Sequence, residues 1–88
     1  MLGHGDLMKL LEEMAALGPG HDWTEDMRRR YAGTSREHVH LALGNPTSSF
    51  GPAETPTDAY RFGPGQVELR YEVDPSDGTW KLAGCHYL

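Results

Sequence analysis

The chain opens with a helical pattern of apolar positions. Between Asp6 and Leu17 apolar side chains recur at i, i+3, i+4 and i+7, and they form one stripe: Leu7, Leu10, Leu11, Met14 and Leu17. Charged residues take the other side, and Gly18-Pro19-Gly20 ends the pattern. This spacing predicts an amphipathic helix over 6–17 with Asp6 as its N-cap. We expect the stripe to pack in the core; docking on a partner is the alternative.

A second helical segment is predicted between His21 and Tyr31. Trp23, Met27 and Tyr31 are spaced four residues apart and would share one face of a helix. Acidic residues stand at its start and three arginines, 28–30, at its end, which complements the helix dipole. The arginines are therefore interpreted as a solvated helix end, and a small basic patch is the alternative.

A third helix is predicted over residues 35–43, with start and stop signals on both sides. Thr34 or Ser35 can cap its N-terminus, and Thr34 with Glu37 has the spacing of a capping box. Gly44 can adopt the left-handed conformation that ends a helix, and Pro46 prevents its continuation. This short helix separates helical sequence from strand-like sequence.

The pattern after residue 57 is that of strands. Residues 66–73 alternate between two sets: Val67, Leu69, Tyr71 and Val73 on one side, and Gln66, Glu68, Arg70 and Glu72 on the other. Such a strand belongs to an antiparallel sheet with one dry face. Strands are also expected over 59–62 and 79–88, with turns at 63–65 and 74–78. Ala83-Gly84 is a candidate β-bulge that would switch the phase of the last strand, so either His86 or Tyr87 would point inward.

Together these elements predict an α+β fold in a single domain, 1–88. Two or three N-terminal helices (helical part 6–44) would pack on one face of a three-stranded antiparallel β-meander (58–88). Residues 45–57 show no periodicity and are predicted to form a long loop, which is a candidate binding loop in so small a domain.

Residues 33–46 carry a resemblance to a known family. They read Gly-Thr-Ser-Arg-Glu-His-Val-His-Leu-Ala-Leu-Gly-Asn-Pro, which is similar to the "G-x-T-x-x-x-V-x-x-x-L-G-x-P" helix of SmpA/BamE domains in the β-lactamase-inhibitor-protein superfamily. The resemblance covers about residues 33–82 and includes the order that follows: a variable loop, an aromatic site, and two strands split by an Asp/Gly turn. The aromatic site departs from the family, because Ala59-Tyr60 stands where Trp-Tyr is usual.

The resemblance implies a non-catalytic domain that holds partner proteins on its sheet face and loops. Some members are outer-membrane lipoproteins and others inhibit enzymes. The lipoproteins carry a leader and an acylated cysteine before the domain, whereas Cys85 lies at the far end of this chain. Membrane anchoring is therefore not expected.

Charge and composition narrow the partner classes. The net charge is −5 and the sequence pI is about 5.4, whereas proteins that bind nucleic acid directly are usually basic. No apolar run of 18 residues is present, so no membrane span is expected. A single cysteine excludes an internal disulfide. We expect a cytoplasmic protein, or a periplasmic one if a leader has been removed.

No arrangement typical of catalysis or metal binding is found. His38 and His40 are two residues apart, which places them about 200° apart on a helix. Neighbours in a strand, such as Cys85 and His86, point to opposite faces. No nucleophile motif or phosphate loop is present. We therefore predict that the chain is not an enzyme and uses no cofactor or metal.

The sequence thus predicts a small protein-binding module that regulates or inhibits another protein through its sheet face and long loop. The candidate contact residues are Phe50, Glu54, Tyr60, Glu68, Arg70 and Glu72. Three alternatives stay open. One is an acidic inhibitor, of the immunity or phage defence-inhibitor type, that masks a basic nucleic-acid-binding surface. It would gather its acidic residues on one face: Asp22, Glu25, Asp26, Glu54, Asp58, Glu68 and Glu72. The others are a small enzyme or metal protein using Cys85 and the histidines, and a self-assembling module such as a homodimer.

Overall fold

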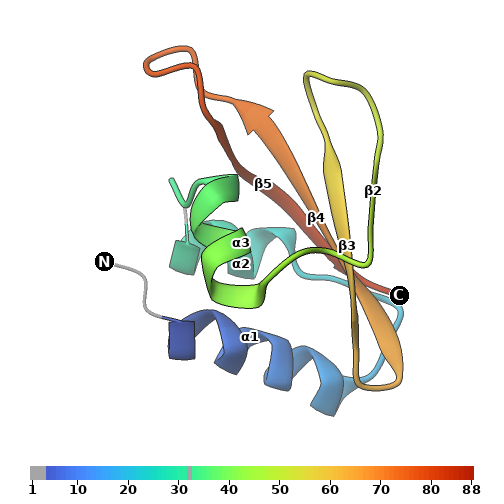
Figure 1. Cartoon of the computed structure of the whole chain (residues 1–88). Coiled ribbons are helices and arrows are strands. Elements are labelled where there is room, and N and C mark those ends of the chain that lie inside the picture. Colours follow the sequence, from blue (N-terminus) through green and yellow to red (C-terminus); the bar gives the residue numbers. More distant parts are fainter. Residues whose placement is uncertain (1–3, 32) are drawn as a thin grey trace.

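The computed structural model describes residues 4–31 and 33–88, with side chains described for 7–31 and 33–88. The chain folds in the following order: α1 (His4–Leu17), β1 (His21–Asp22), α2 (Thr24–Tyr31), α3 (Arg36–Leu43), β2 (Ser48–Phe50), β3 (Thr57–Phe62), β4 (Gly65–Val73) and β5 (Trp80–Tyr87). Figure 1 shows the three helices gathered on one side of the sheet, with the two hairpin turns separating at one end. The predicted α+β class with an antiparallel sheet is confirmed, but the helices do not all precede the sheet, because β1 lies between α1 and α2.

The predicted number of strands is wrong. Within the described ranges the sheet has five antiparallel strands in the order β1-β5-β4-β3-β2. β2 lies inside the segment 45–57 that was predicted to be a loop, and it pairs with β3. β1 pairs with the end of β5. Strands of two and three residues are too short to show a period of two, so only the neighbouring strand reveals them.

The boundaries of the first two helices also differ from the prediction. α1 begins at His4, two residues before Asp6; the side chain of Asp6 lies outside the described residues, so its capping role stays untested. The stripe of α1 is buried except for Leu17, which is 65% exposed at the helix end. α2 begins at Thr24 rather than His21, because Asp22 belongs to β1 and its carboxylate accepts a hydrogen bond from the Thr24 backbone N–H at 2.9 Å.

α3 has the caps that its sequence predicts. Ser35 is the N-cap, and its side chain accepts a hydrogen bond from the His38 N–H at 3.2 Å. Gly44 ends the helix with a φ of 80°, a conformation that favours glycine. The capping box from Thr34 to Glu37 is wrong, because Thr34 lies before the cap and its carbonyl oxygen accepts a hydrogen bond from the Leu82 N–H at 2.9 Å. That bond ties the start of α3 to β5.

One buried apolar cluster joins residues of all three helices with residues of β3, β4 and β5. The predicted alternation of β4 is confirmed for Val67, Leu69 and Tyr71, which are at most 1% exposed. Val73 was expected in the same row but is 44% exposed. It pairs with Trp80 near the hairpin turn, which projects away from the helices in Figure 1.

The predicted bulge is confirmed at Ala83. Arg70 lies opposite Gly84 and Tyr71 lies opposite Leu82, so one residue of β5 has no partner between them. The bulge reverses the phase of β5, because Leu82 on one side of it and Cys85 on the other are both buried. Tyr87, not His86, points inward: Tyr87 is fully buried and His86 only partly so.

Candidate functional site

An ion-pair network lies at the junction of α3, β2 and β3. Its centre is Asp58, which is fully buried. Arg36 donates hydrogen bonds to both carboxylate oxygens, from Nε at 3.0 Å and from Nη2 at 2.7 Å. His40 Nε2 lies 2.6 Å from Oδ2, and the Ser49 hydroxyl donates to Oδ1 at 2.7 Å. Three residues from two elements, α3 and β2, therefore hold one carboxylate of β3, and the carboxylate in turn fixes the position of Arg36.

The network keeps Asp58 ionised. Burial by itself would raise the pKa of this carboxyl, but hydrogen bonds from Arg36, Ser49 and His40, together with the charge of Arg36, lower the pKa to about 2. The side chains of Arg36 and His40 are only 22% and 34% exposed. Arg36 and Asp58 therefore form an internal ion pair with several further hydrogen bonds, unlike the exposed pairs elsewhere on this chain.

Arg36 also contacts two aromatic rings. Its guanidinium carbon lies 5.6 Å from the centre of the Tyr71 ring and 5.5 Å from the centre of the Trp80 ring. Both distances allow cation–π attraction. Tyr71 is buried, whereas Trp80 is 39% exposed. Arg36 thus connects the buried carboxylate to a tryptophan at the surface.

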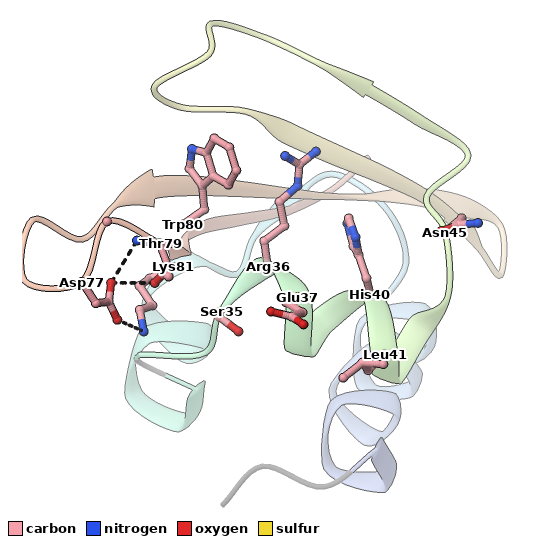
Figure 2. Close-up of a pocket in the computed structure, with 11 residues that line it drawn as sticks. Ser35, Arg36, Glu37, His40, Leu41, Asn45, Asp77, Thr79, Trp80 and Lys81 are labelled. Atoms are coloured by element: carbon pink, nitrogen blue, oxygen red, sulfur yellow. Dashed lines mark hydrogen bonds and ion pairs between the residues drawn. The ribbon is translucent and has the colours of Figure 1, made fainter.

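Two open hollows meet at Arg36 and Trp80. The larger has a volume of about 800 Å³ and lies between α3 and the β4–β5 turn; its walls include Ser35, Glu37, Leu41, Asp77 and Lys81. Figure 2 shows these side chains, which come from α3 and its N-cap, from the β4–β5 turn and from the start of β5, with Arg36 and Trp80 pointing to the same side. The smaller has a volume of about 310 Å³, and its walls include Phe50, Pro52 and Pro56.

Exposed apolar side chains gather around these hollows. Among the described residues the large exposed hydrophobic side chains are Leu17, Leu41, Phe50, Val73, Trp80 and Leu88. Leu41 is 65% exposed in the larger hollow, Phe50 is 48% exposed in the smaller, and Trp80 borders both. Apolar and aromatic groups placed together at a concave surface are typical of binding sites.

The predicted contact residues lie in different parts of the structure, and only one of them lines a hollow. Phe50 lies at the smaller hollow. Glu54 is exposed in the turn between β2 and β3 and lines neither hollow. Tyr60 is only 7% exposed, and its hydroxyl donates to the Gly44 carbonyl oxygen at 2.9 Å, so it forms part of the buried cluster. Burial also raises the pKa of Tyr60 to about 12, which keeps its hydroxyl protonated.

The other three predicted residues share the face of β4 opposite its buried residues. Arg70 and Glu72 are exposed and form an ion pair at 3.6 Å. Glu68 is partly buried and accepts a hydrogen bond from the Gln66 side chain at 3.1 Å. They lie together, but none of them lines either hollow at Arg36 and Trp80.

Sequence reasoning missed the network around Asp58. Arg36 and His40 are four residues apart on one helix and so share a side of it, which was an available signal. Asp58 stands directly before the strand predicted over 59–62, where a carboxylate that becomes buried needs a partner. Ser49, however, carried no signal, because β2 was not recognised.

The network does not have the arrangement of a catalytic triad. In a Ser-His-Asp triad the histidine lies between the serine and the aspartate and takes the serine proton. Here Asp58 lies between Ser49 and His40. The Cys85 thiol is fully buried, and burial raises its pKa to about 12, which suppresses the reactive thiolate.

Among residues 4–31 and 33–88 the structure brings together no group of three histidine, cysteine or carboxylate side chains suited to a metal ion. In the same part of the chain, no helix combines the length and apolar character needed to cross a membrane.

One of the acidic residues that the acidic-inhibitor alternative requires, Asp58, does not lie on the surface. Asp58 is enclosed by its network. Asp26 pairs with Arg29, Glu72 with Arg70, and Asp22 lies 3.6 Å from His86. Arg29 and Arg70 therefore compensate two of these charges, those of Asp26 and Glu72.

No family model, curated protein or solved structure matches the chain. The resemblance of residues 33–82 to SmpA/BamE domains therefore stays a prediction. The features that bear on the chain's function are the two hollows and the residues around them.

Proposed function

We propose that this chain is a small non-catalytic protein-binding module that regulates or inhibits a partner protein. The partner would occupy the two hollows beside Arg36 and Trp80, and in the smaller hollow it would contact the segment of this chain that carries Phe50. The observation that carries the proposal is the gathering of Leu41, Phe50 and Trp80 around these hollows. Tryptophan and arginine at the centre of a concave surface are the residue types that dominate the energetics of protein interfaces.

The network at Asp58 supports a binding role because it holds the surface rigid. Asp58 fixes Arg36, Arg36 lies against Trp80, and Ser49 ties the neighbouring strand to the same carboxylate. A surface that is already ordered loses less conformational entropy when a partner binds. The SmpA/BamE resemblance supports the same class of function.

The test is site-specific photo-crosslinking with a matched control. Leu41 and Leu17 are both leucines on helices and both 65% exposed, but of the two only Leu41 lines one of the two hollows at Arg36 and Trp80. A benzophenone amino acid at Leu41 should crosslink one defined partner in the native host, and the same group at Leu17 should not. The partner identified by mass spectrometry is then purified, and its activity is measured with and without the chain.

Two results decide the proposal. Leu41→Ser should weaken binding to the purified partner at least about fivefold, and Leu17→Ser should leave it unchanged, since only the former loses apolar contact area at the interface. Equal crosslinking at both positions, or a purified partner that does not bind, would refute it. A crosslink to a second copy of the chain would replace the proposal with self-assembly.

A further inference from the structure

The cationic side chains of the larger hollow are already paired. Arg36 gives two hydrogen bonds to Asp58. Lys81 Nζ lies 3.1 Å from the Asp77 carboxylate, which also accepts hydrogen bonds from the backbone and side chain of Thr79. An anionic ligand would have to compete with Asp58 and Asp77 for these cations. The hollow is therefore poorly suited to an acidic partner.

Glu37 is the charged group of the hollow that lacks a partner. It is exposed on α3, and its carboxylate makes no ion pair or hydrogen bond with any residue that the structure describes. Leu41 follows four residues later and so lies on the same side of the helix. The two side chains present a carboxylate next to an exposed apolar group, as Figure 2 shows.

The part of Trp80 that Arg36 does not cover supplies a further feature that favours a cation. Its indole is 39% exposed and borders the hollow that contains Glu37. A lysine or arginine side chain gains from contact with an indole face and from a carboxylate nearby. The chain as a whole carries a charge of −5, which attracts basic partners over longer distances.

We infer that the larger hollow binds a basic, partly apolar segment of a protein partner. A lysine or arginine of that segment pairs with Glu37 and lies against Trp80, and a neighbouring apolar residue covers Leu41. The inference rests on the proposed function and specifies the chemistry of the partner.

Peptide titrations followed by NMR test the inference on the full chain. The probe is a 12-residue peptide of alternating arginine and leucine; the comparison peptides replace every arginine with glutamate, or every leucine with serine. The two indole N–H signals of the protein come from Trp23 and Trp80 and are assigned with Trp80→Phe. The basic, apolar peptide should shift the Trp80 signal and leave that of the buried Trp23 in place.

Charge variants show whether Glu37 forms an ion pair with the bound peptide. Glu37→Gln should weaken binding about two- to fivefold, the range for one exposed ion pair, and added salt should weaken it further. Glu12→Gln is the matched control, since Glu12 is also an exposed helical glutamate but lies outside the hollow. Circular dichroism verifies that each variant is folded.

Three outcomes would overturn the inference. They are equal losses for the two variants, stronger binding of the glutamate peptide, and no shift of the Trp80 signal with any peptide. Stronger binding of the glutamate peptide at Trp80 would leave the proposed function standing and change only the partner's charge. The crosslinking experiment at Leu41 decides separately whether the proposed function also fails.

Discussion

Replacing Asp58 with asparagine should destabilise the fold strongly without creating a cavity. The two side chains have nearly the same shape, but the asparagine amide replaces one acceptor oxygen with a donor. In either orientation of the amide that donor would face Arg36, whose guanidinium bonds both carboxylate oxygens and can only donate. The guanidinium of Arg36 would then remain in a half-buried place without its counter-ion.

The expected loss is about 2–4 kcal/mol. Removing one member of a buried ion pair costs about 3–5 kcal/mol, because the other charge is left uncompensated. Water can reach the network in part, since the side chains of Arg36 and His40 are 22% and 34% exposed, and this reduces the cost. At about 0.05–0.15 kcal/mol per residue, a chain of 88 residues has a total stability of about 4–13 kcal/mol. The substitution therefore removes a large share of it.

Urea denaturation followed by circular dichroism measures the loss. With a slope of about 1–1.5 kcal/mol per molar urea, a loss of 3 kcal/mol lowers the midpoint by about 2–3 M. Asp77→Asn is the control: Asp77 also pairs with a base, Lys81, but at an exposed turn, so its midpoint should fall much less than that of Asp58→Asn. If Asp58→Asn costs no more than Asp77→Asn, the network does not stabilise the fold as argued.

Three other predictions concern pH, glycine packing and the thiol. The folded-state pKa of Asp58 is about 2 and lies below its ordinary value of about 3.9. The contribution of ionised Asp58 to the stability of the fold is therefore complete above pH 4 and is lost as the pH falls through 2. Acid titration should destabilise the wild type more than Asp58→Asn. Gly65→Ala should lower the melting temperature by roughly 5–15 °C, because a Cβ there would lie 2.5 Å from the Leu88 carbonyl oxygen. In Gly84→Ala the new Cβ meets only the flexible guanidinium of Arg70 at 3.3 Å, so the melting temperature should change by less than about 5 °C. Cys85 should react with iodoacetamide more than about 100-fold slower in the native protein than in urea, because burial raises its thiol pKa to about 12; similar rates would show that the thiol is accessible.

Local sequence alone determined the elements with a strong period or clear caps. The stripe of α1 as far as Met14, the caps of α3 at Ser35 and Gly44, and the alternation of β4 through Tyr71 all match the structure. The bulge at Ala83 was also predicted from neighbouring small residues. In each case the signal is contained within about a dozen residues, because helix and strand periods and capping bonds are local.

Only the tertiary structure decided the edges of the sheet and the candidate site. β1 and β2 exist because β5 and β3 offer them hydrogen-bonding partners, and segments of two or three residues carry no pattern of their own. Asp58 bonds Arg36 and Ser49, which lie 22 and 9 positions earlier in the sequence. Trp80, which contacts Arg36, lies 22 positions after Asp58. Such contacts depend on how the helices and hairpins approach each other, and no local propensity encodes that geometry.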